Sequence, residues 1–93
     1  MEDIIKKVEK YEETTRKGLE KIKKKEKLSE KEEKIAEDFL SMAKNYFEDG
    51  KFFKKKEDYY TALASFSYAH AWLDAGVRAH LFETNDDQLF TLP

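Results

Sequence analysis

The amino-acid sequence predicts an all-α fold, an antiparallel up-down-up three-helix bundle with helices over residues of about 3–26, 29–55 and 59–83 and a short C-terminal tail. Two observations predict this fold class. Apolar residues recur at intervals of three and four along each of the three segments, which is the spacing of one face of an α-helix. The breaks between the segments are short, and short connections favour antiparallel neighbours that bury their apolar faces together.

The composition is that of one small domain, residues 1–93. The sequence has no Cys, which excludes a disulfide framework, and no run of about 18 apolar residues that would span a membrane. The 18 Lys and Arg residues nearly balance the 20 Asp and Glu residues, so the chain is not built mainly to neutralise phosphates. These features predict a cytoplasmic protein without a cofactor.

The first helix is predicted from a narrow apolar face, formed by Ile4, Val8, Tyr11, Thr15, Leu19 and Ile22. A narrow face suits a helix that touches the bundle from outside. Leu28 and Ser29 mark the break after it. The run from Ser29 to Glu32 has the pattern of a capping box, in which both side chains bond the free backbone amides at a helix start. The second helix is therefore expected to begin there.

Gly50 raises the question of where the second helix ends, because Asp49-Gly50 resembles a helix stop. The apolar positions nevertheless form one unbroken stripe, made of Ile35, Phe39, Met42, Tyr46, Gly50 and Phe53. An interior Gly costs about 1 kcal/mol relative to Ala, whereas burying a Phe side chain gains about 1.5–3 kcal/mol. The helix is therefore predicted to continue to about Lys55, with Asp58 as the N-cap of the third helix.

The third helix is the most apolar part of the chain, because Asp74 and Arg78 are the only charged residues between Tyr59 and Phe82. Its predicted core face consists of Tyr59, Leu63, Phe66, His70, Leu73, Val77 and Leu81. Further apolar residues flank this face, namely Tyr60, Ala64, Ala71, Ala75 and Phe82. So wide an apolar arc is expected of a central helix or of a helix with an additional partner.

The outer face of the third helix is the predicted interaction surface. It consists of Ala62, Ser65, Tyr68, Ala69, Trp72, Gly76 and Ala79. Ala62, Ala69 and Gly76 recur every seven positions, and a strip of small residues would let a second helix approach closely. Tyr and Trp are frequent hot spots of protein contacts. We therefore interpret the chain as a non-enzymatic interaction or scaffold module that binds a second copy of itself, as a homodimer, or another protein.

The C-terminal tail offers an alternative explanation of this face. Residues 84–93 contain Leu89, Phe90 and Leu92, and a free tail is usually more polar. The tail is therefore expected to fold back onto the bundle, where Phe90 or Leu92 would cover Trp72.

Three polar residues of the third helix, His70, Asp74 and Arg78, follow one another at intervals of four and can form a ladder along the edge of the core. The simpler interpretation is a buried, neutral His70 that bonds a neighbour. The alternative is an accessory or enzymatic role, in which Asp74 orients the imidazole. The sequence lacks a nucleophile or second acid at a defined spacing and lacks the HExxH zinc pattern, so no metal site is predicted.

Lysine-rich segments at helix ends suggest a further alternative, weak RNA binding. They are the run from Lys21 to Lys27 and the triplet Lys54 to Lys56. Glu20, Glu26 and Glu30 dilute the first of these, and salt-sensitive binding is the most that such a segment supports.

Part of the chain resembles one tetratricopeptide repeat, in which small residues let two antiparallel helices approach while aromatic residues fill the space between them. The matching positions are Tyr46, Gly50, Phe53, Ala62, Phe66 and Ala69. A solenoid of such repeats needs about three copies, and the sequence has one. The resemblance therefore implies helical-hairpin packing rather than membership.

A longer segment, from Ala43 to Phe82, resembles the small archaeal family catalogued as domain of unknown function 357. The run from Tyr68 to Gly76, YAHAWLDAG, carries most of the similarity. The resemblance implies a closed three-helix up-and-down bundle and implies no known activity, catalytic residue or cofactor. The family more often has Gly at the position of Ala71, which implies a looser helix contact there in this chain.

Overall fold

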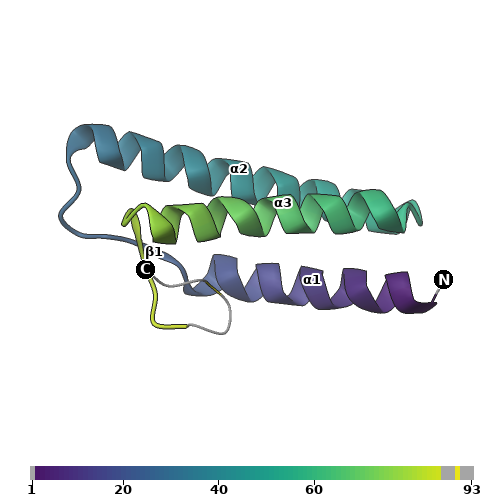
Figure 1. Cartoon of the computed structure of the whole chain (residues 1–93). Coiled ribbons are helices and arrows are strands. Elements are labelled where there is room, and N and C mark those ends of the chain that lie inside the picture. The colour runs from purple at the N-terminus through teal and green to yellow at the C-terminus, as the bar shows by residue number, and fades with distance from the viewer. Residues whose placement is uncertain (1, 87–89, 91–93) are drawn as a thin grey trace.

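The computed structural model, which describes residues 2–86 and residue 90, confirms the all-α class and the three-helix bundle. Its helices are α1 (Glu2–Lys21), α2 (Glu30–Lys55) and α3 (Tyr59–Arg78), and they run antiparallel in sequence order (Figure 1). Helix α3 lies between the other two, packing most extensively on α2 and less on α1, while α1 and α2 touch sparingly. This central position accounts for much of the wide apolar arc of α3.

Helices α1 and α3 end about one turn earlier than predicted, because the chain beyond each of them pairs as a short strand. Strand β1 (Lys23–Lys24) and strand β2 (Phe82–Glu83) are antiparallel, with Lys24 opposite Phe82. The backbone amide of Lys25 adds a hydrogen bond to the carbonyl oxygen of Leu81, at 3.0 Å. Since adjacent residues of a helix point in different directions, leaving the helix is what allows both Leu81 and Phe82 to be buried.

The end of α3 is a Schellman motif built without glycine. The amide of Leu81 donates to the Gly76 carbonyl oxygen at 2.9 Å, and the amide of His80 donates to the Val77 carbonyl oxygen at 3.1 Å. His80 has the positive φ of 62° that this motif requires. The motif turns the chain back toward the bundle and so directs Phe82 beneath α3.

Helix α2 ends in the same way. The amide of Glu57 donates to the Lys54 carbonyl oxygen and the amide of Asp58 donates to the Phe53 carbonyl oxygen, both at 3.0 Å. Glu57 has a φ of 61°, a left-handed conformation that costs a residue with a Cβ atom about 1–2 kcal/mol. The turn between α2 and α3 therefore contains a strained residue that a glycine would relieve.

We expect Glu57→Gly to stabilise the protein by about 1 kcal/mol, less than the full strain because glycine also gains freedom in the unfolded chain. For a domain of this size the melting temperature should rise by roughly 4–8 °C, as measured by circular dichroism. Lys56→Gly is the matched control, because Lys56 has a φ of −82° and no strain to relieve. A melting temperature of Glu57→Gly at or below that of the wild type would contradict the assignment of strain to Glu57.

Helix α2 runs through Gly50 to Lys55, as its apolar phase predicts, and it begins at the predicted capping box. The amide of Glu32 donates to Ser29 Oγ at 3.1 Å, and the amide of Ser29 donates to the Glu32 carboxylate at 2.9 Å. Gly50 is required by close packing, since a Cβ atom there would lie 2.5 Å from a carbon of the Phe66 ring. The helix therefore keeps a residue of poor helix propensity where an aromatic ring of α3 meets its backbone.

The predicted core face of α2 is wrong by a small rotation. The residues buried in α2 are Ala36, Ala43, Phe47 and Gly50. Ile35 is 37% exposed instead, while Met42 and Tyr46 are half-buried. The apolar stripe that the sequence predicts as core therefore lies at the edge of the contact between α2 and α3, which we call the α2–α3 seam.

The buried face of α3 is also rotated relative to the predicted core face, in the sense that matches the rotation of α2. The buried residues of α3 are Ala62, Ser65, Phe66, Ala69, Leu73, Gly76 and Val77. Phe66, Leu73 and Val77 confirm part of the predicted core face, but Tyr59, Leu63 and His70 are only half-buried. The small residues that the sequence analysis places outside are inside.

The rotation has a physical cause in two matching strips of small residues. Helix α2 carries Ala36, Ala43 and Gly50 every seven positions, and α3 carries Ala62, Ala69 and Gly76 at the same interval. The ring contacts of Phe39 with Trp72 and of Phe47 with Phe66 set an antiparallel register in which the two strips face each other in reverse order. Small residues at a contact shorten the distance between helix axes, so the larger side chains beside the strips can fill the space between the helices.

Candidate functional site

The predicted interaction surface divides into buried and exposed residues. Ala62 and Ala69 are 0% exposed, Ser65 is 8% exposed and Gly76 is buried. The expectation that these four face outward is wrong, because they form the seam between α3 and α2. The Ser65 hydroxyl donates to the Thr61 carbonyl oxygen at 2.9 Å, which satisfies it within the helix.

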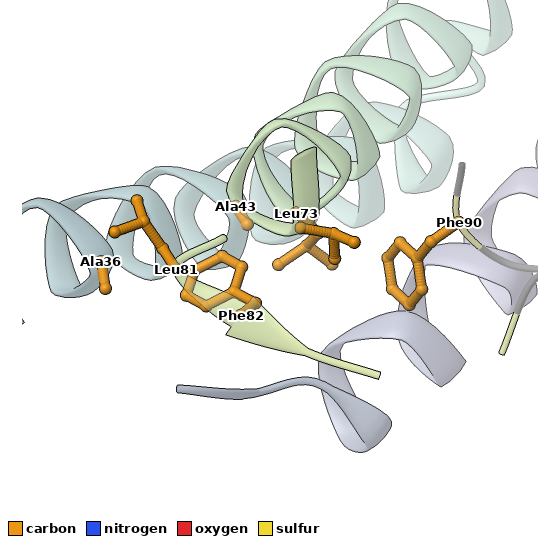
Figure 2. Close-up of a cluster of buried hydrophobic side chains, with 7 residues drawn as sticks. Ala36, Ala43, Leu73, Leu81, Phe82 and Phe90 are labelled. Carbon is orange, nitrogen blue, oxygen red and sulfur yellow. The ribbon is translucent and has the colours of Figure 1, made fainter. Parts of the chain in front are cut away.

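Gly76 illustrates what the small residues accommodate. A Cβ atom at this position would overlap two carbons of the Phe82 ring, which is itself only 2% exposed. The close approach that Gly76 permits is therefore that of Phe82 from the same chain. Figure 2 shows Phe82 beneath α3, beside Leu81 and close to Ala36 and Ala43 of α2.

The remaining predicted residues, Tyr68, Trp72 and Ala79, lie at the surface or partly so. The Tyr68 ring packs on Tyr46 with centroids 4.4 Å apart, and the Trp72 ring packs on Phe39 at 5.0 Å. Tyr68 and Trp72 also meet each other at 6.1 Å. Phe39 and Tyr68 therefore both contact the Trp72 ring, which also packs against the core and stays partly exposed.

These contacts define one continuous surface, the aromatic patch, across the outer side of the α2–α3 seam. Its members are Ile35, Phe39, Met42 and Tyr46 of α2 with Tyr68, Ala71, Trp72 and Ala75 of α3. Tyr68 is 49% exposed. The contribution of α2 to this patch is not predicted from the apolar stripe. The strip of small residues on α2 could have revealed it, because that strip identifies the true core face and leaves Ile35 and Met42 outside it.

The alanines of α3 give this patch its shape. All the exposed alanines lie on the outer face of α3 or at its C-cap, namely Ala64, Ala71, Ala75 and, as the C-cap, Ala79. Tyr68, Ala71, Trp72 and Ala75 enclose a shallow groove of about 260 Å³. The exposed faces of α1 and α2 consist mainly of Lys, Glu and Asp, so an exposed face of alanine and aromatic residues is peculiar to α3.

Phe90 of the tail packs against the bundle on a different side from the one predicted. Phe90 is 3% exposed and stacks on His70, with ring centroids 5.2 Å apart and planes inclined by 5°. A Cβ atom at Gly18 of α1 would lie 3.1 Å from the Phe90 ring, so Phe90 fills the space between α1 and α3 (Figure 2). The prediction that Phe90 covers Trp72 is wrong, and Leu92 lies outside the described residues.

His70 lies at the edge of a second groove rather than sealed in the core. This groove has a volume of about 350 Å³ and is lined by Lys10, Tyr11, Thr14, Thr15, Ser67 and His70. Thr15 forms its floor and is bound to α3, because its hydroxyl donates to the Phe66 carbonyl oxygen at 3.3 Å. Asp74 is half-buried and Arg78 is exposed, one and two turns further along α3. The polar ladder of His70, Asp74 and Arg78 stays a prediction.

Neither a metal-binding group of side chains nor a membrane-spanning helix is present in the part of the chain that the structure describes. Within it, no group of three or more His, Cys, Asp or Glu side chains is placed to hold a metal ion. Among the same residues, none of the helices combines the length and the apolar character that crossing a bilayer would need.

Three lysines of the lysine-rich helix ends, Lys21, Lys24 and Lys54, form ion pairs with carboxylates. Lys24 lies in β1 and contacts Glu33 at 2.8 Å and Glu37 at 3.1 Å, while Lys54 contacts Glu12 at 2.8 Å. The hydrogen bond to Glu33, with that to Glu37, raises the pKa of Lys24, and the hydrogen bond to Glu12 raises the pKa of Lys54. These ion pairs tie the helices together and reduce the positive field that RNA binding would need.

Comparison with known proteins identifies one similarity. A family model described as "Protein of unknown function (DUF357)" matches residues 10–82, which include most of α1 and all of α2 and α3. No curated protein and no solved structure matches the chain. The match covers the whole of the small-residue seam and the aromatic patch.

Proposed function

The chain belongs to the DUF357 family, whose description assigns no activity, and we propose from its surface that it is a non-enzymatic interaction module that binds a protein partner through the aromatic patch. The observation that carries the proposal is the face of α3, where Tyr68 and Trp72 stand beside exposed alanines. A helix face in contact with water alone is normally covered by charged residues. Here the charged residues are on α1 and α2 instead.

The chemistry of the patch suits protein contacts. Tyr and Trp residues supply large contact areas at a small cost in conformational entropy, and they dominate the binding energy of many interfaces. Their rings are already held by Tyr46 and Phe39, so a partner would meet a surface that needs little rearrangement. Alanine at positions 71 and 75 leaves room for side chains of the partner to reach these rings.

The groove beside His70 favours a second candidate, an accessory or enzymatic role. It brings the imidazole together with the hydroxyl groups of Tyr11, Thr14 and Ser67. Its lining, as described, includes no carboxylate that would act as a second acid or base, and Asp74 is not part of it. Binding of a small polar molecule is therefore better supported than catalysis there. RNA binding by the lysine-rich ends has the least support, since Lys24 and Lys54 are engaged in ion pairs.

We expect Ala71→Glu to weaken binding of the partner at least tenfold, or about 1.4 kcal/mol, because it places a charge at the centre of an apolar contact. Ala71 is exposed, so the substitution leaves the fold of the separate chain intact. The test begins with capture on the tagged protein from cells that express it and identification of the captured chain. The captured chain is then purified and titrated calorimetrically with wild type and variant.

Phe52→Glu is the matched control, since Phe52 is a 54% exposed aromatic residue near the end of α2 and is not a member of the patch. It should bind the purified partner with the affinity of the wild type. A partner that binds Ala71→Glu as tightly as the wild type, or that is lost equally with Phe52→Glu, would show that the aromatic patch is not the contact surface.

A further inference from the structure

We propose that the partner is a second copy of this chain, and that the two copies pair through α3 in an antiparallel arrangement with two-fold symmetry. This inference rests on the proposed function, because it uses the same aromatic patch. It adds that the partner is a second copy of this chain, and it gives the register in which the two α3 helices pair. The order of large and small residues along the outer face of α3 supports this arrangement.

A two-fold contact must be complementary to itself, so each bulky residue that α3 contributes to the patch needs a small residue at its symmetry-related position. With the two-fold axis between Ala71 and Trp72, Tyr68 of one copy faces Ala75 of the second copy. Trp72 faces Ala71 of the second copy. One turn further out, Ala64 faces Ala79 of the second copy, where two small residues allow the helices to come close. Large residues therefore meet small ones in both central layers.

The groove on this face fits the same arrangement. Tyr68, Ala71, Trp72 and Ala75 line it, and in the antiparallel register the Tyr68 ring of the second copy is directed toward Ala75 within it. The bulky residue, Tyr68, and the small residue that receives it in the second copy, Ala75, thus lie on one surface, only two turns of α3 apart. In a contact between two different surfaces, nothing would require the bulky residue and the small residue to lie on the same helix.

Charge is compatible with a second copy as the occupant. Charges that face each other across a contact must be complementary, and the members of the aromatic patch carry none. The charged residues of α3, Asp74 and Arg78, have opposite signs and do not belong to the patch. Two copies can therefore meet along this face without placing like charges opposite each other at its centre.

Single cysteines test the register, because the natural chain has no Cys. Ala71→Cys lies next to the axis and should form a disulfide-linked dimer under mild oxidation. Ala64→Cys should stay monomeric under the same conditions, since its two copies lie about 20 Å apart along the helices at a rise of 1.5 Å per residue. The double variant Ala64→Cys and Ala79→Cys should cross-link, because each new thiol faces the other across the contact.

Light scattering and the fluorescence of the single tryptophan test the association itself. The wild type should be a dimer at high concentration, and its Trp72 emission should shift on dilution. Ala71→Glu should raise the dissociation constant at least tenfold, while Phe52→Glu should leave it unchanged. A dimer in which Ala64→Cys cross-links and Ala71→Cys does not would overturn the register.

The outcomes also separate this inference from the proposed function. A wild type that stays monomeric up to about 1 mM, where an association of only about 4 kcal/mol would appear, overturns the dimer. If a different purified protein then binds the wild type and not Ala71→Glu, the interaction module survives with another occupant. If neither a second copy nor another protein depends on Ala71, both proposals are wrong.

Discussion

Replacing Gly76 by Ala is expected to destabilise the protein by about 2 kcal/mol, although Ala favours a helix over Gly by about 1 kcal/mol. The added methyl group would overlap the Phe82 ring. That ring is almost completely buried, and its backbone is held by the pairing of β2 with β1, so it has little freedom to move aside. Urea unfolding followed by far-UV circular dichroism measures the difference directly.

The sign of the effect distinguishes two roles for Gly76. If Gly76 left space for a partner and not for the Phe82 ring, replacing it by Ala would stabilise the separate chain through helix propensity alone. Ala75→Gly on the adjacent exposed position is the control, and it should cost about 1 kcal/mol by propensity. Combining Gly76→Ala with Phe82→Leu should cost less than the two single changes together, because the smaller side chain leaves room for the methyl group. Additive costs would mean that the two residues do not contact each other in solution.

Replacing Phe66 by Ala is expected to cost about 3–5 kcal/mol, the range for a fully buried aromatic residue. Phe66 is 0% exposed, its ring meets Phe47 with centroids 5.5 Å apart, and it lies against Gly50. A domain of this size has a total stability of about 5–15 kcal/mol. The variant should therefore be partly or fully unfolded at 37 °C, as measured by urea unfolding and by the loss of ellipticity on heating.

Two comparisons make the Phe66 result specific. Phe52→Ala should change the free energy of unfolding by less than about 0.5 kcal/mol, because Phe52 is 54% exposed. Gly50→Ala should destabilise the wild type through its clash with the Phe66 ring, yet be neutral or stabilising in the Phe66→Ala background. A loss of less than 1 kcal/mol in Phe66→Ala would contradict the packing of α3 against α2.

The small residues of α3 show how one sequence feature can support two different interpretations. A strip of Ala and Gly on a helix indicates close approach of another helix, and this much of the interpretation is confirmed. The approaching helix is α2 of the same chain, and Phe82 completes the contact at Gly76. The resemblance of part of the chain to one tetratricopeptide repeat implies helical-hairpin packing, which agrees with the extensive contact between α2 and α3. The outer face of α3 is a separate surface, and its function stays a proposal.

Sequence alone determined the features that depend on neighbouring residues in the chain. The capping box at Ser29, the turn before α3 and the passage of α2 through Gly50 all follow from local bonding or from apolar phase. The fold class follows as well, because three amphipathic segments with short connections have few ways to bury their apolar faces. Family membership agrees with the resemblance carried by the run from Tyr68 to Gly76.

Only the tertiary structure decided which faces of α2 and α3 are buried, where Phe90 lies and where α1 and α3 end. Periodicity identifies an apolar stripe, but a helix as apolar as α3 has several, and side-chain size alone favours the wrong one. The matching strips around Ala43 and Ala69 gave the closer contact, and Phe82 had to leave the helix to pack on Gly76. These choices depend on the shape of surfaces from separate segments, and such complementarity exists only when the segments are brought together.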